Sequence, residues 1–72
     1  SRVINTRDSA TQFFMVDSAP NGCTARHDGV VGPGENRNIG YWPGSLILFT
    51  DASSATPIAE YVFGEPTLFV IQ

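Results

Sequence analysis

The stretch Leu46-Ile47-Leu48-Phe49 decides the fold of this chain of 72 residues, and no apolar run in the chain is longer. It follows the turn-forming pair Pro43-Gly44 and ends in the polar segment Asp51-Ala52-Ser53-Ser54. Four consecutive apolar residues between turn signals are typical of a strand covered on both faces. We therefore predict a strand over Leu46 to Asp51 in the middle of a sheet. The run is far shorter than the roughly 20 residues that a membrane helix needs, so we expect no membrane span.

Outward from this run, short stretches rich in β-branched and aromatic residues recur about every ten residues, separated by Gly, Pro, Asn and Asp. This spacing is typical of an all-β domain, and no segment predicts a helix. Thr11 to Asp17 is apolar on both faces in its middle, which predicts a second central strand. The other predicted strands are Arg2 to Asn5, Cys23 to Val31, Asn36 to Tyr41, Pro57 to Phe63 and Thr67 to Ile71.

The connections between these strands carry recognisable turn chemistry. Pro20-Asn21-Gly22 favours a tight hairpin, because proline fixes one backbone angle and Asn-Gly accepts positive ones. Asp28-Gly29 predicts a bulge or a second turn, and Gly32-Pro33-Gly34 a crossing between sheets. The exposed face of an open sheet would need a cover that so short a chain cannot supply. We expect one domain over residues 1–72, a small antiparallel β-sandwich of six or seven short strands.

A family resemblance supports this architecture. From Val3 onward, the order of features resembles the β-domain of the von Hippel-Lindau tumour suppressor family, a seven-stranded sandwich with an immunoglobulin-like Greek key. That family binds a hydroxyproline-bearing peptide through a tyrosine, a serine, a histidine and a tryptophan. Where the last two would fall, this chain has Ser45 and Ile47, so the resemblance implies the fold and not that ligand. The residues that carry it are Val3, Ile4, Asn5, Arg7, Pro33-Gly34, Arg37, Ile39, Gly44, Leu46, Leu48-Phe49, Asp51-Ala52 and Leu68-Phe69-Val70.

Charge and cysteine content narrow the partners. Four scattered arginines, no lysine and seven carboxylates give a net charge of -3, which argues against nucleic acid and anionic membranes, since both need clustered cations. Cys23 is the only cysteine, so no internal disulfide can form. We expect it to be a half-buried small residue. The Ser, Thr and Asn content and the missing lysine slightly favour an extracellular location.

Tyr41-Trp42-Pro43-Gly44 lies where a strand runs into a turn. Trp42 could stand on the surface as a stacking platform for a sugar ring or a proline. The single large aromatic of a small domain more often closes one end of the core. The sequence favours the core position.

Two further clusters have a chemical and a structural interpretation. Arg26-His27-Asp28 with Cys23 could indicate acid-base work or a metal site, but neighbouring strand residues face opposite ways and one His with one Cys is too few ligands for zinc. We predict a solvated hairpin, with no metal, no cofactor and no catalytic residues. Asp51, with Ser53, Ser54 and Thr56, could hold Ca²⁺ or a sugar, but such residues more often cap their own turn.

Two function classes follow. We prefer a non-catalytic binding module that presents the loops at one end of the sandwich to a neutral glycan or a short peptide. The alternative is a structural or assembly domain that self-associates, or pairs with a larger subunit, through an apolar face or an edge strand. An enzyme is disfavoured, because no catalytic constellation shares a face. The candidate ligand-binding residues are Asn21, Tyr41, Trp42, Ser45, Asp51 and Ser53.

Overall fold

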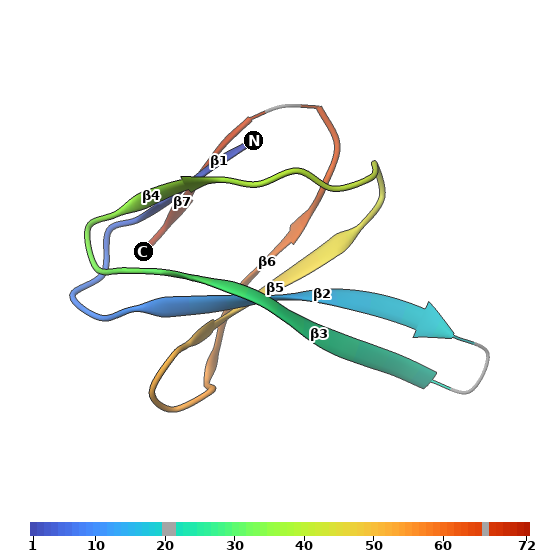
Figure 1. Ribbon diagram of the computed structural model, residues 1–72, viewed down its shortest axis with the longest axis horizontal. Helices are drawn as coiled ribbons and strands as arrows, with labels where there is room; N and C mark the ends of the chain where they lie inside the picture. The colour runs from blue at the N-terminus through green and yellow to red at the C-terminus, as the bar shows by residue number, and fades with distance from the viewer. Residues whose placement is uncertain (20–21, 66) are drawn as a thin grey trace.

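The computed structural model describes residues 1–19, 22–65 and 67–72 and shows an all-β protein, as predicted (Figure 1). No helix that could cross a membrane occurs in this described part of the chain. Seven strands form two sheets, which confirms the predicted sandwich-like architecture. The strands are β1 (Arg2–Asn5), β2 (Thr11–Ala19), β3 (Gly22–Val31), β4 (Asn36–Asn38), β5 (Leu46–Asp51), β6 (Pro57–Val62) and β7 (Leu68–Ile71).

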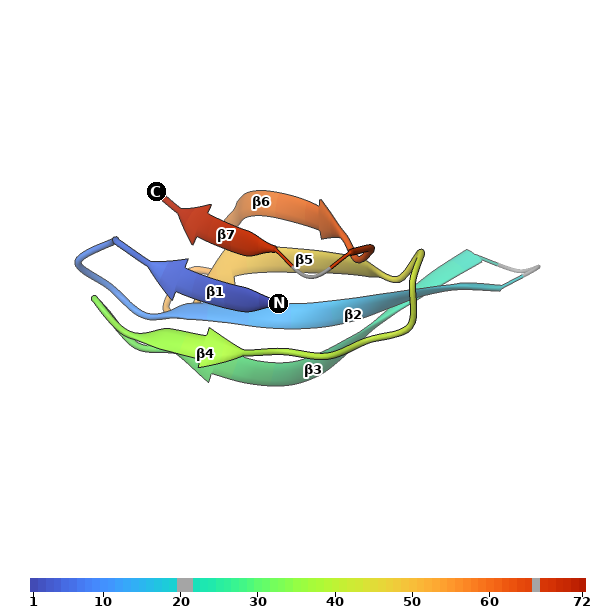
Figure 2. The same cartoon turned by 90° about the horizontal axis from the view of Figure 1, so that it is seen from above.

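The two sheets form two layers, and Figure 2 shows the smaller sheet in front of the larger one. The three-stranded sheet has the order β4-β1-β7 and the four-stranded sheet has the order β3-β2-β5-β6. β2 and β5 are the inner strands of the larger sheet, which confirms the two strands predicted to be central. The strand pairs are antiparallel except β1 and β7, which run parallel. A parallel pair needs a long connection, and here nearly the whole chain lies between its two strands.

The register of the β2–β3 pair shifts once. Phe13 pairs with Gly29 and Phe14 pairs with His27, so Asp28 is an extra residue on β3. This is the bulge predicted at Asp28-Gly29. A bulge bends its strand and re-aims the side chain of the extra residue, and Asp28 thereby faces the interior side of the sheet with Gly29.

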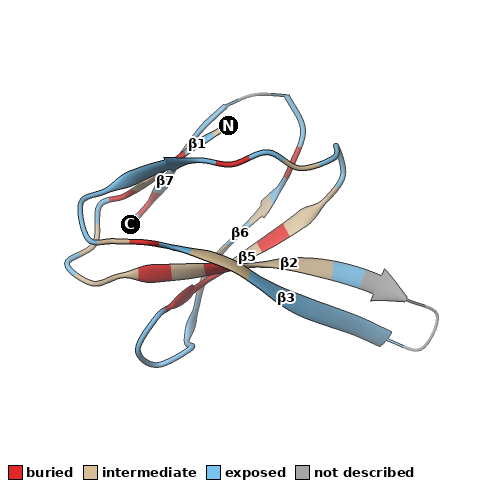
Figure 3. Cartoon of the chain, in the orientation of Figure 1, coloured by how far each residue is buried: buried red, intermediate tan, exposed pale blue. Residues whose placement is uncertain are grey.

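Buried residues recur along the strands of both sheets (Figure 3), and their side chains form one core cluster between the sheets. Phe49 is fully buried, stacks on Phe69 with ring centroids 5.3 Å apart and lies 6.1 Å from Phe13. The core thus draws on both inner strands and on the sheet above them. Its buried apolar members are Val3, Phe13, Val31, Ile39, Ile47, Phe49, Phe63 and Ile71.

Asn5 is a fully buried polar residue that ties three segments together. Its Nδ2 donates to the carbonyl oxygens of Ser9 at 2.9 Å, Val31 at 3.0 Å and Gly32 at 3.2 Å. Its Oδ1 accepts the Arg7 backbone N–H at 3.0 Å. The side chain therefore joins β1 of the smaller sheet to the end of β3 of the larger one.

The segment from β3 to β4 crosses between the sheets, as predicted, and it does so in a tight turn. The Glu35 N–H donates to the Gly32 carbonyl at 3.1 Å, and Gly34 has a φ of 72°, which favours glycine. β4 itself ends at Asn38, three residues before the predicted Tyr41. Its partner β1 begins at Arg2, which pairs with Asn38, and Ile39 still exchanges backbone hydrogen bonds with Ser1. Gly40 and Tyr41 then have no strand to join among the described residues.

Candidate functional site

The segment between β4 and β5 forms the candidate site, and its end is held by a turn. The Ser45 N–H donates to the Trp42 carbonyl at 3.1 Å across Pro43-Gly44, and Gly44 has a φ of 92°. Proline followed by a glycine with positive φ is the usual chemistry of such a turn. Two backbone hydrogen bonds of 2.7 Å hold this turn to Phe63. The Gly44 N–H donates to the Phe63 carbonyl, and the Phe63 N–H donates to the Ser45 carbonyl.

Tyr41 connects this segment to the core and to β3. Its ring packs edge-on against Phe63, with centroids 5.8 Å apart. Its hydroxyl donates to Asp28 Oδ2 at 2.7 Å. Burial of the phenol and its hydrogen bond to the Asp28 carboxylate raise the pKa of Tyr41, so it is a neutral donor at physiological pH.

Asp28 holds Arg26 as well as Tyr41. Arg26 Nε donates to Asp28 Oδ1 at 3.0 Å, and this bond together with the one from Tyr41 lowers the pKa of the carboxyl group. Hydrogen bonding to Asp28 in turn raises the pKa of the Arg26 guanidinium. Arg26 Nη2 also lies 3.3 Å from Met15 Sδ. The guanidinium is therefore oriented by two neighbouring side chains, although it stands largely in solvent.

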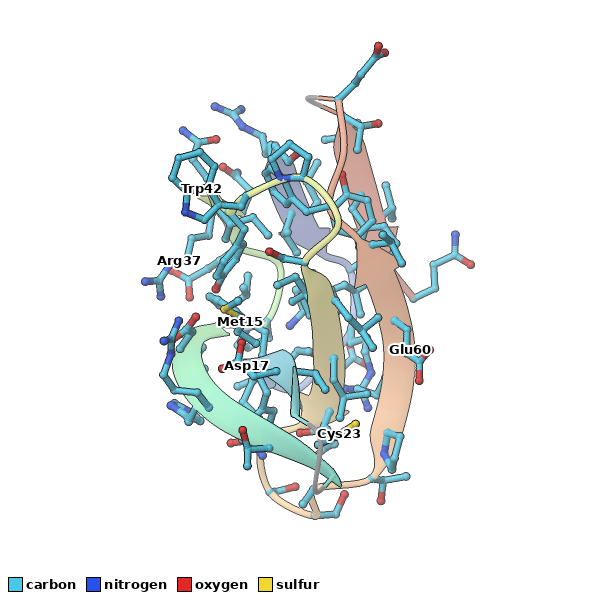
Figure 4. The ribbon with its side chains drawn as sticks, turned by 90° about the vertical axis from the view of Figure 1, so that its right-hand side faces the viewer. Met15, Asp17, Cys23, Arg37, Trp42 and Glu60 are labelled. Carbon is cyan, nitrogen blue, oxygen red and sulfur yellow. The ribbon has the colours of Figure 1, made fainter. Side chains whose placement is uncertain are left out.

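An open groove of about 640 Å³ lies between these groups, and a second depression adjoins it at Gly40 and Tyr41. Trp42, 83% exposed, stands at the groove. Figure 4 shows Trp42 and Met15 on the same side of the molecule as Arg37, which lines the second depression. A Cβ built at Gly40 would meet no atom within 4 Å, so the glycine keeps the groove wide. The groove is lined by Met15, Arg26, Gly40, Tyr41 and Trp42.

The structure contradicts the predicted burial of two residues. Trp42 lies on the surface and not in the core, because the preceding Tyr41 takes the inward position against Phe63. Cys23 is exposed and not half-buried. It lies near the β2–β3 turn, beyond the Val16–Leu46 pair at which β5 stops accompanying β2.

Asp51 and Ser53 form a capped turn at the other end of β5. Asp51 Oδ1 accepts the Ser53 N–H at 2.8 Å and its hydroxyl at 2.6 Å. Asp51 Oδ2 accepts Arg7 Nη2 at 2.9 Å and the Ser9 hydroxyl at 3.1 Å. The bonds from Ser53, followed by those from Arg7 and Ser9, lower the pKa of the Asp51 carboxyl group. All of these groups serve the local fold, in agreement with the predicted turn cap.

The five candidate residues that the structure describes consequently do not form one surface. Tyr41 and Trp42 line the groove, and Ser45 is half-buried in the adjoining turn. Asp51 ends β5 and Ser53 follows it, about 17 Å from Leu46 at the other end of the strand, since six residues make five steps of roughly 3.3 Å. A single strand separates the two groups, which is why they cannot share an end of the sandwich. Asn21 lies outside the described residues.

His27 does not belong to the groove. Its ring packs edge-on against Phe14, with centroids 5.3 Å apart, on the opposite face of the sheet from Arg26 and Asp28. Across the described residues, no three His, Cys, Asp or Glu side chains come close enough to hold a metal ion. The cluster Arg26-His27-Asp28 is thus divided between two faces.

Sequence reasoning missed Met15, Arg26 and Gly40 as parts of the site. Met15 follows Phe14 in an apolar run and carries no signal that it faces a groove, whereas Gly40 between Ile39 and Tyr41 is a recognisable gap in side-chain cover. Comparison of the chain with family models, with curated protein sequences and with solved structures finds no match. The groove is therefore interpreted from its own chemistry.

Proposed function

We propose that this domain is a non-catalytic binding module that recognises a neutral glycan or a short peptide in the groove beside Trp42. One observation carries the proposal: an indole that is 83% exposed stands at an open groove next to a fixed Tyr41 and Arg26. A large exposed aromatic on a small domain leaves apolar area in water unless a ligand covers it. A sugar ring or a proline ring fits that flat face.

The polar lining supports a ligand without net charge. Arg26 and Asp28 are paired at 3.0 Å and cancel each other's charge. Asp28 leaves part of the guanidinium free, and Asn38 lines the adjoining depression. Amide and guanidinium donors beside an aromatic platform suit sugar hydroxyls and peptide carbonyls alike.

Titration of the protein with a panel of neutral oligosaccharides and proline-containing peptides, followed by tryptophan fluorescence, tests the proposal. Trp42 is the only tryptophan, so any change in emission reports on this site. A saturating change with oligosaccharides identifies a glycan module, and one with peptides identifies a peptide module. A panel in which neither class changes the emission or the amide spectrum of groove residues refutes the proposed function.

Variants locate the site. Trp42→Ala should abolish binding, whereas Trp42→Phe should retain part of it because a smaller ring remains. Gly40→Val should block the groove without strain, because space around Gly40 is open. Leu68→Ala is the matched control, since Leu68 is an exposed apolar residue on the other sheet. Equal binding by Gly40→Val and the unchanged protein would place the ligand elsewhere.

A further inference from the structure

The outer face of the four-stranded sheet carries apolar side chains that do not pack into the core between the sheets. Along β2 and β5 the side chains alternate, so the burial of Phe13, Ile47 and Phe49 between the sheets sends their neighbours outward. The apolar side chains on this face next to the Leu46 end of β5 are here called the outer patch: Phe14 and Val16 of β2, Leu46 and Leu48 of β5, and Val62 of β6. None of these five belongs to the core cluster or packs against it.

Two cross-strand rows build the outer patch. In one row Val16 pairs with Leu46, which pairs with Val62. In the next row Phe14 pairs with His27 on one side and Leu48 on the other, and Leu48 pairs with Glu60. The second row therefore has an imidazole at the β3 edge and a carboxylate at the β6 edge. Figure 4 shows Glu60 at the opposite edge of the molecule from Met15, Arg37 and Trp42.

We propose that the outer patch is a docking surface for a second copy of this chain, stacked face to face across a two-fold axis parallel to the strands. Such an axis carries β3 of one copy over β6 of the other. His27 then faces Glu60 of the second copy, and the same pair forms again on the other side of the axis. An imidazole N–H can donate to a carboxylate, so both polar edges of the row find partners while the apolar centre is buried.

The alternative in-plane axis, perpendicular to the strands, lacks this match. It would place β3 over β3 and β6 over β6, so that each Glu60 would lie along the same edge as the Glu60 of the second copy. Like charges at one edge are unfavourable in an interface. The arrangement of His27 and Glu60 at opposite ends of one row thus selects the axis parallel to the strands.

The size of the patch predicts a weak dimer. Four strands spaced about 4.8 Å apart, over about six residues at roughly 3.3 Å each, give a flat footprint of about 380 Å². Two copies together bury about 760 Å² by this measure, and somewhat more because side chains stand up from the sheet. This is below the roughly 1,200 Å² of stable interfaces, so association should depend strongly on concentration.

Sedimentation of the protein between about 10 µM and 1 mM tests the proposal, because a weak interface dissociates within this range. We expect the average mass to rise from monomer toward dimer. Val62→Lys should raise the dissociation constant at least about tenfold, because it leaves an amine in an apolar interface. Leu68→Lys is the matched control, since Leu68 is 57% exposed and Val62 is 62% exposed. It should change the constant less than about twofold.

A charge swap tests the axis independently of the apolar centre. His27→Glu and Glu60→Lys should each weaken association several-fold, and the double variant should restore it. Both residues are exposed, so each variant should keep the circular dichroism of the folded protein. A double variant as weak as either single one would overturn the proposed pairing.

Other outcomes overturn the proposal outright. A protein that stays monomeric at 1 mM while its outer patch binds a hydrophobic dye would assign the patch to a different polypeptide. Dissociation by Leu68→Lys as strong as by Val62→Lys would assign the contact to the smaller sheet. Trp42→Ala should leave the dimer intact, so the test is independent of ligand binding in the groove.

Discussion

Replacing Asn5 by aspartate should strongly destabilise the fold, although it changes only the amide group of one side chain. The substitution keeps the shape of the side chain but removes the Nδ2 donor shared by the carbonyls of Ser9, Val31 and Gly32. A buried polar group left without a partner costs about 1–3 kcal/mol, and the Val31 carbonyl is the most enclosed of the three. The carboxylate also faces the negative ends of these three dipoles.

We expect Asn5→Asp to lower the free energy of unfolding by about 2–5 kcal/mol at pH 7. The free energy of unfolding of a 72-residue domain is only about 4–11 kcal/mol, at roughly 0.05–0.15 kcal/mol per residue. The new carboxyl at position 5 should have a raised pKa in the folded state, because burial and the carbonyls both disfavour its anion. The folded variant then binds more protons than the unfolded one above the unfolded pKa of about 3.9. Its deficit should therefore shrink as the pH falls toward 4.

Urea unfolding followed by circular dichroism at pH 7 and pH 4 measures both effects. Asn38→Asp is the matched control, because it adds the same charge at an exposed position of β4. The reasoning would be refuted if the free energies of unfolding of Asn5→Asp and Asn38→Asp differed by less than about 0.5 kcal/mol at pH 7. It would also be refuted by a difference between the two variants that does not narrow at pH 4.

Two further predictions concern the neighbourhood of the bulge. Gly29→Ala should lower the free energy of unfolding by about 1–3 kcal/mol, because the added Cβ would lie 2.7 Å from the buried Phe13 ring. Thermal unfolding measures this loss, with Gly40→Ala as the control because a Cβ at Gly40 lies in open space. Tyr41→Phe should cost about 1 kcal/mol at pH 7 and raise the pKa of Asp28. The lowered pKa of Asp28 stabilises the fold at pH values above the unfolded pKa, and this stabilisation is lost in acid. The Tyr41→Phe variant should therefore lose less stability on acidification than the unchanged protein. Carboxyl titration by NMR measures the pKa of Asp28, and an unchanged pKa in the variant would contradict the prediction.

Local sequence patterns predicted most of the fold. Leu46 to Asp51 is a strand in the structure with the predicted bounds, because an apolar run between turn residues has few alternatives. Gly34 and Gly44 each follow a proline and have positive φ, so the two Pro-Gly pairs in the sequence correctly marked turns. Asp28-Gly29 within a strand pattern predicted a bulge or a second turn, and the register of the β2–β3 pair shows that it is a bulge.

What the sequence did not settle depends on contacts between distant segments. Tyr41 and Trp42 are adjacent aromatics in a connection without periodicity, so only Phe63 and Asp28 decide which ring turns inward. The separation of Trp42 from Asp51 could have been predicted from the sequence, since Trp42 precedes the predicted strand and Asp51 is its last residue. The Greek-key connection and the family resemblance remain predictions.

The parallel pairing of β1 with β7 bears on how the protein folds during synthesis. Arg2 pairs with Leu68, 66 positions further along the chain, whereas β2 and β3 pair across a hairpin. The pairing of β1 with β7 can form only after residues 68–71 have left the ribosome, whereas β1 can pair with β4 before that. Loop closure over so long a separation slows folding. Until β7 is added, a nascent chain lacks one strand of the cover over the inner face of the β2–β3–β5–β6 sheet and exposes apolar side chains to chaperones.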